Sequence, residues 1–137
     1  MLGTLEAALS DFQEGYLFDV KRLITGDVFS DILDQSQHLL HSGYHQAAMV
    51  LGGAVLEDTL RSLCSRHDID TPSKPKLDKM NADLAKAGCY TKLVQKRITG
   101  IADVRNSAAH GKWDEFSEDD VRDALSWIVR FVGDNCG

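Results

Sequence analysis

The sequence predicts an all-α protein, a single-domain bundle of five to six helices, and three observations support this class. Apolar residues recur at intervals of three and four along nearly the whole chain, and no stretch alternates between apolar and polar residues as a strand would. The chain has only two prolines, and both lie in the segment from Thr71 to Pro75. A length of 137 residues suits one core, so residues 1–137 are expected to form one helical domain.

Two helices are predicted at the start of the chain. The first covers residues 4–24, where apolar residues are spaced at three and four, and Gly26 interrupts it. The second begins at Asp27 or Ser30, either of which can cap a helix, and ends around Ser42-Gly43. A hairpin into the third helix follows.

The third helix is expected over residues 44–67, and its broad apolar stripe is typical of a central position in a bundle. Gly52 and Gly53 within it cost roughly 1 kcal/mol of helix propensity each. Close approach of another helix would offset that cost. A short helix over residues 77–87 is then predicted to stop at Gly88.

Two more helices complete the predicted bundle. One starts near Tyr90 and directs an apolar face inward. The last has the clearest start, because Ser117 can cap it and Asp120 stands where the carboxylate of a capping box belongs. Phe116 and Val121 are spaced to pack together as a hydrophobic staple.

Cysteine usage and hydropathy indicate a soluble, cytoplasmic protein. Cys64, Cys89 and Cys136 are odd in number and show no C-x-x-C spacing, so neither a disulfide framework nor a thiolate metal site is expected. The N-terminus has no apolar run of signal-peptide length, and nowhere do 18 apolar residues follow one another. No membrane association is expected.

Charge is distributed unevenly along an acidic chain. The net charge of −6 argues against generic electrostatic binding of nucleic acid. Residues 73–112, however, hold nine Lys or Arg against three Asp, a net charge of +6, so the remainder carries −12. This positive segment either focuses a polyanion on one cleft or is neutralised by acidic helices packed against it.

The richest chemistry lies in residues 105–111, which read R-N-S-A-A-H-G. Arg105 and His110 are about 140° apart around an ideal helix, whereas Asn106 and His110 share a face. We therefore expect Asn106 to orient the imidazole, and Gly111 to end the helix in a left-handed cap. The result is a phosphate-binding cation and a titratable ring at an accessible helix end.

The residues from Arg105 to His110 resemble the R-N-x-x-x-H signature of HEPN domains, all-helical modules many of which are metal-independent endoribonucleases in toxin–antitoxin and antiviral systems. The run A-V-L-E-D-T-L-R at residues 54–61 looks like the earlier long helix of such domains. The resemblance covers about residues 27–132, after the helix expected over residues 4–24. It implies a HEPN-like fold, catalytic Arg105 and His110, no cofactor, an RNA substrate, an antitoxin or regulatory protein as partner, and motifs paired across a homodimer.

Cleavage of RNA without a metal needs a base near the ribose 2′-hydroxyl, an acid near the 5′-oxygen and a cation on the phosphorane. Arg105 supplies the cation and His110 one acid or base. A helix C-terminus favours the protonated imidazole, which suits an acid. A second histidine from a symmetry mate would complete the pair.

Four further residues are expected to support this site. Glu57 lies at the edge of an apolar stripe, and a partly buried carboxylate there needs a partner, for which Arg105 is the first candidate. A solvated position for Glu57 is the alternative. Ser107, Ala108 and Ala109 are small enough for a partner helix to approach closely across a dimer axis. Packing inside the bundle is the alternative for these three.

Two other sets of residues have weaker claims to a site. His38, His41 and His45 have metal-ligand spacing on an uninterrupted helix, but Gly43 is expected to break that helix, so no metal is predicted. Four aromatic residues have the side chains that stack on bases, although such spacings are more often those of a core: Tyr90, Trp113, Trp127 and Phe131.

Two functions from different classes follow. The first is a HEPN-like, metal-independent endoribonuclease that serves as a toxin or defence effector. The alternative is a non-catalytic HEPN-like module that dimerises and binds a protein or nucleotide partner. The overall acidity of the chain favours the alternative.

Overall fold

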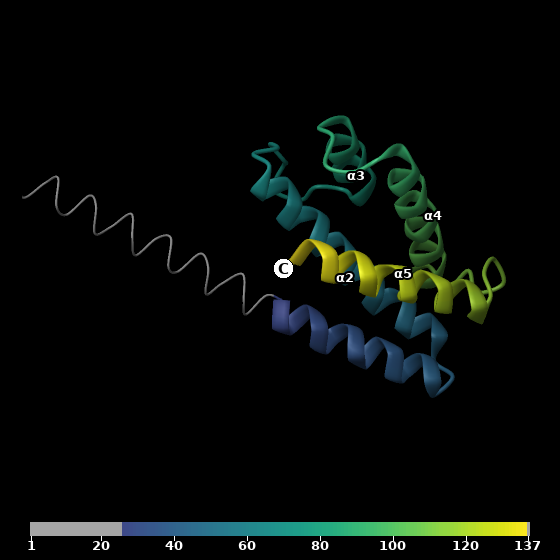
Figure 1. The fold of residues 1–137 in the computed structure, drawn as a ribbon. Coiled ribbons are helices and arrows are strands. Elements are labelled where there is room, and N and C mark those ends of the chain that lie inside the picture. Colours follow the sequence, from purple (N-terminus) through teal and green to yellow (C-terminus); the bar gives the residue numbers. More distant parts are fainter. Residues whose placement is uncertain (1–25, 137) are drawn as a thin grey trace, which may run out of the picture.

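Every regular element of the computed structural model, which describes residues 26–136, is a helix, as the sequence predicted (Figure 1). In Figure 1, α2 and α5 lie at the centre, with the helix of residues 26–41 on one side and α3 and α4 on the other. The expected helix over residues 4–24 lies outside the described residues. After the helix of residues 26–41, the elements are α2 (His45–Arg66), α3 (Leu77–Lys86), α4 (Lys92–Ala109) and α5 (Glu118–Cys136). In the described part of the chain, no helix has the length and apolar character needed to cross a membrane.

The helix over residues 26–41 differs from its prediction at one end. Gly26 is itself helical, so the helix does not begin at Asp27 or Ser30. Glycine lowers helix propensity by about 1 kcal/mol, but helical dihedral angles remain open to it, so the predicted start at Asp27 or Ser30 was wrong. The other end is as expected, because Gly43 takes a φ of 91° and turns the chain into α2.

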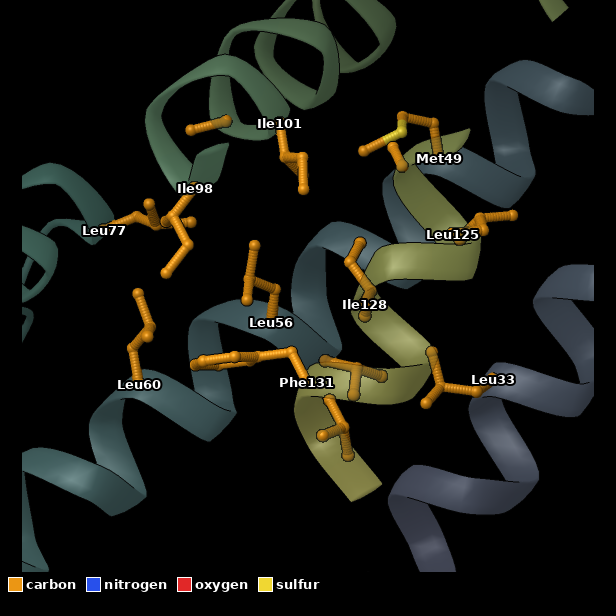
Figure 2. Packing of buried hydrophobic residues seen from close by; sticks show 14 of the residues in the cluster. Leu33, Met49, Leu56, Leu60, Leu77, Ile98, Ile101, Leu125, Ile128 and Phe131 are labelled. Atoms are coloured by element: carbon orange, nitrogen blue, oxygen red, sulfur yellow. The ribbon is translucent and has the colours of Figure 1, made fainter. Parts of the chain in front are cut away.

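The core forms around α2, which receives side chains from all its neighbours. Figure 2 shows Leu56 of α2 among apolar residues of α4 and α5, with Leu33 of the helix over residues 26–41 nearby. The predicted close approach at the two glycines is present. A Cβ atom on Gly52 would fall within 3.0 Å of the Leu125 side chain of α5, and one on Gly53 would fall within 3.0 Å of Arg105 of α4. The two glycines thus let two helices pack directly on α2.

A buried asparagine ties α3 to α4. The Asn81 residue is only 2% exposed, and its amide nitrogen donates to the Gln95 carbonyl at 3.0 Å and to the Thr99 hydroxyl at 3.2 Å. Its amide oxygen accepts a 2.6 Å hydrogen bond from the Tyr90 hydroxyl. The Tyr90 ring packs edge-on against Phe131, so the same network reaches α5. All the polar atoms of Asn81 are therefore satisfied in the core.

Alkaline pH should destabilise the protein through Tyr90. Burial raises the pKa of its hydroxyl above the ordinary value of 10.0, and Cys64 and Cys89 raise it further. Because the folded state keeps this proton after the unfolded chain has lost its own, the contribution of Tyr90 to the free energy of unfolding is constant below about pH 10 and falls above it. Tyr90→Phe should weaken that fall, and it should cost about 1–3 kcal/mol at neutral pH because Asn81 loses a partner.

Urea unfolding at neutral pH and above pH 10 measures both effects. Tyr44→Phe is the matched control, because Tyr44 is 62% exposed. An equally steep alkaline fall in the Tyr90→Phe and Tyr44→Phe proteins would contradict the assignment to Tyr90.

The start of α5 confirms the predicted capping box. The Ser117 amide donates to the Asp120 carboxylate at 2.9 Å, and the Asp120 amide donates to the Ser117 hydroxyl at 3.1 Å. Phe116 and Val121, which flank the box, are both buried in the core. These interactions fix how the loop that follows α4 enters α5.

Candidate functional site

The helix that carries the R-N-S-A-A-H-G string ends as the sequence predicted. Gly111 has a φ of 73°, and His110 is the C-cap residue of α4. The Lys112 amide donates to the Ser107 carbonyl at 2.9 Å, and the Gly111 amide approaches the Ala108 carbonyl at 3.5 Å, which is the Schellman arrangement. Because these bonds satisfy carbonyls of the last turn, the His110 side chain is not needed to cap the helix. His110 is exposed.

Arg105 forms the ion pair with Glu57 that was its first predicted contact. A guanidinium nitrogen of Arg105 lies 3.1 Å from a carboxylate oxygen of Glu57, and each side chain is about one-quarter exposed, 26% and 24% respectively. The solvated position considered for Glu57 is therefore wrong. Gly53 lies one turn before Glu57 on α2, and the aliphatic part of the arginine side chain packs where Gly53 has no Cβ. Gly53 and Glu57 together fix the position of Arg105.

The ion pair between Arg105 and Glu57 fixes the position of the guanidinium more than it stabilises the folded protein. An exposed ion pair is worth about 0–1 kcal/mol, and a fully buried pair can cost as much desolvation energy as it gains. Arg105 and Glu57 lie between these limits. A guanidinium has five N–H donors in a fixed plane, so a single hydrogen bond to Glu57 orients the group and leaves other donors for a ligand.

Asn106 does not orient His110 as predicted. The Asn106 residue is exposed, and among the hydrogen bonds of residues 26–136 none joins its amide group to the imidazole. The two residues are linked only through the backbone, where the His110 amide donates to the Asn106 carbonyl at 3.0 Å. The prediction extended helical periodicity to His110, but the cap has φ −96° and ψ 9°, which is no longer helical.

The three small residues between them have three different environments. Ala108 is 6% exposed and belongs to the protomer's own core, so the predicted contact of its side chain with a partner helix is wrong. Ser107 is half-buried, and its hydroxyl donates to the Glu115 carboxylate at 2.9 Å. Ala109 alone of the three is exposed. A partner helix would therefore meet α4 at Ala109.

The aromatic candidates separate into core and surface residues. Trp127 and Phe131 stack with ring centroids 4.8 Å apart and pack with the core, as was expected of aromatics at helical spacing. Trp113 does not follow that expectation, because it is 55% exposed. Its indole nitrogen donates to the Ala108 carbonyl at 3.1 Å, which fixes one edge of the ring to the end of α4. Its location in a polar loop directly after Gly111 was the sequence signal for a surface position.

The charged surface of α4 meets acidic residues of α5. A groove of about 290 Å³ lies between the two helices, and neither Arg105 nor His110 lines it. Its lining combines basic residues of α4 with carboxylates of α5, and consists of Lys96, Arg97, Gly100, Ile101, Val104, Asp120, Asp123 and Ala124. Here the positive segment and the acidic remainder of the chain face each other, which favours mutual neutralisation over a focused positive cleft.

The histidines with metal-ligand spacing lie on separate helices. The turn at Gly43 divides His38 and His41 from His45, as predicted. The His45 ring packs edge-on against Phe116 with centroids 6.0 Å apart. Among the described residues, no group of three or more His, Cys, Asp or Glu side chains is placed to hold a metal ion.

Comparison of the chain with protein-family models, curated proteins and solved structures finds no match. The residues at the end of α4 and the contacts that position them are therefore the features that indicate a function.

Proposed function

We propose that the protein is a HEPN-like, metal-independent endoribonuclease that acts as a toxin or defence effector. The observation that carries this proposal is that Glu57 and Gly53 hold Arg105 in place, while His110 is exposed at the end of the same helix. An oriented cation and an accessible imidazole are two of the three groups that metal-free RNA cleavage needs. The resemblance of residues 105–110 to the HEPN signature supports the same reaction.

In the proposed reaction the ribose 2′-oxygen attacks the adjacent phosphorus atom, and the bond from phosphorus to the 5′-oxygen breaks. A base removes the proton of the 2′-hydroxyl, and an acid delivers a proton to the departing 5′-oxygen. Arg105 stabilises the negative charge that builds up on the phosphorane oxygens, using N–H donors that Glu57 does not occupy. His110 is the acid or the base, and the products carry a 2′,3′-cyclic phosphate and a 5′-hydroxyl.

The proposed site is completed by a second copy of the chain. One protomer offers a single histidine at the end of α4, whereas the reaction uses both an acid and a base. A homodimer that brings two α4 ends together at Ala109 supplies the second imidazole. Sedimentation of the wild-type protein, with cleavage measured over the same concentrations, tests this arrangement. Full activity of a sedimenting monomer would contradict a composite site.

Cleavage should survive removal of divalent metal ions. We expect purified protein to cleave RNA in excess EDTA and to leave 2′,3′-cyclic phosphate ends, because the nucleophile is the substrate's own 2′-hydroxyl. Mass spectrometry of the products identifies those ends. An oligonucleotide with a single 2′-deoxy position at the cleavage site is the control, and it should remain intact there. Products with 3′-hydroxyl ends would contradict the mechanism.

Two observations favour a second candidate, a non-catalytic HEPN-like module that dimerises and binds a protein or nucleotide partner. Glu57 already neutralises Arg105, and the chain carries a net charge of −6. Both features weaken the attraction of a polyanion. A stable dimer that cleaves no RNA and is harmless when expressed would favour this module over the nuclease.

A further inference from the structure

Trp113 is an exposed aromatic residue with a fixed orientation. Within the described residues it is one of five exposed large hydrophobic residues, and it is the one that follows the R-N-S-A-A-H string, three positions after His110. Its N–H edge is bonded to the Ala108 carbonyl. The Ser107–Glu115 hydrogen bond ties the same loop to α4 a second time. The ring is thus held in position while more than half of the residue contacts solvent.

The polar surroundings of Trp113 suit a base better than a protein partner. Its neighbours Lys112, Asp114 and Glu115 are exposed and charged. Asn106, on the last turn of α4, is exposed and polar. A stable protein interface buries about 800 Å² on each partner around a continuous apolar centre, and one tryptophan among charged residues does not provide that centre. A nucleobase, by contrast, needs only the face of one ring, and Trp113 is 55% exposed while its N–H is bonded within the protein.

The charge of the loop indicates which part of a nucleic acid is contacted. Lys112 is outnumbered by Asp114 and Glu115, so residues 111–116 carry a net charge of −1. Phosphates gain little from such a loop, and the attraction must come from stacking. Bases inside a duplex already stack on each other, so only an unpaired base presents a free face.

We propose that Trp113 is the stacking platform for an unpaired base of single-stranded RNA beside the Arg105–His110 site. This inference rests on the proposed function for RNA as the ligand. It adds a substrate class, single-stranded rather than double-stranded RNA, and a residue that selects it. Stacking on an aromatic residue is tolerant of base identity, so the selection is for strandedness and not for sequence.

The fluorescence of Trp113 gives a direct test. The chain has two tryptophans, and Trp127→Phe leaves Trp113 as the only one while keeping an aromatic ring on Phe131. The probe is a single-stranded 2′-O-methyl oligoribonucleotide, which has no free 2′-hydroxyl and is not cleaved. It should quench Trp113, whereas an abasic oligonucleotide of the same charge and a duplex of the same sequence should not. Raising the salt concentration should change the affinity little.

Substitution of Trp113 provides a second test of the stacking role. Trp113→Ala should weaken binding of the labelled single strand roughly tenfold or more, the effect expected for loss of one stacked base. Trp113→Phe should retain most of the affinity because it keeps a ring face. Quenching by the abasic strand equal to that by the intact strand would overturn the inference.

The outcomes separate this inference from the proposed nuclease. Cleavage of RNA by a Trp113→Ala protein with unchanged affinity overturns the stacking role and leaves the nuclease standing. Base-dependent quenching by a protein that cleaves no RNA supports the stacking role and removes the nuclease. If Trp113→Ala instead converts a sedimenting dimer into a monomer, the exposed ring of Trp113 contacts a second copy of the chain and not a base, and the inference is wrong.

Discussion

Replacing His110 by alanine should lower the rate of RNA cleavage by about 10²-fold or more while the fold stays intact. The first effect is the usual cost of losing a general acid or base. The second follows because the imidazole is exposed and the end of α4 is closed by backbone hydrogen bonds to Gly111 and Lys112. Single-turnover cleavage and thermal unfolding, measured on the same preparations, record the two effects.

His67 provides a matched control for this variant. It is the exposed C-cap of α2, with φ −101° and ψ 14°, close to the φ −96° and ψ 9° of His110. His67→Ala therefore removes an imidazole from an equivalent helix end without touching the proposed site. Equal losses of activity in both variants would assign the effect to helix capping. Undiminished cleavage by His110→Ala would identify a contaminating nuclease.

Gly53→Ala should lower the rate of RNA cleavage strongly while changing the free energy of unfolding only a little. A Cβ atom there would overlap the Cγ atom of Arg105, so the arginine side chain or one of the two helices must shift, and we expect the guanidinium to move away from Glu57. Overpacking costs about 1–3 kcal/mol, and the gain in helix propensity of about 1 kcal/mol offsets part of it. Displacement of the cation by about 1 Å is expected to lower cleavage by about 10²-fold. Cleavage well below the melting temperature, together with urea unfolding, measures both quantities.

The neighbouring glycine serves as the control. Gly52→Ala adds the same methyl group to the same helix, but its Cβ atom would overlap Leu125 of α5 instead of Arg105. We expect Gly52→Ala to destabilise the protein to a similar extent and to leave the cleavage rate of the folded protein within a few-fold of wild type. Equal losses of activity in the two proteins would show that Gly53 has no special part in positioning Arg105.

Features that depend on local chemistry were predictable from the sequence. The turns at Gly43 and Gly111 and the capping box at Ser117 each involve residues within a few positions of one another, and each is present. The pairing of Glu57 with Arg105 was predictable for a different reason. A partly buried carboxylate on the edge of an apolar stripe requires a partner, and Arg105 was the first candidate for it.

The remaining details of the site depend on tertiary structure or on small departures from helical geometry. Asn106 misses His110 because the chain leaves the helix at the cap. Ala108 and Ala109 are adjacent and chemically identical, and only the packing of the bundle buries one and exposes the other. Gly53 was noticed as a point of close approach, but nothing in the sequence indicated that the approaching side chain was Arg105.

The glycine pair of α2 also bears on the order in which the site is assembled. An isolated helix with two central glycines lacks roughly 2 kcal/mol of propensity, so α2 gains most of its helical stability from the helices that pack on it. At the glycine pair those helices are α4, which carries Arg105 and His110, and α5. In a partly folded chain in which α4 has not docked on α2, Arg105 therefore has no fixed position. The cation and its partner Glu57 come together only when the bundle closes, which couples assembly of the site to formation of the core.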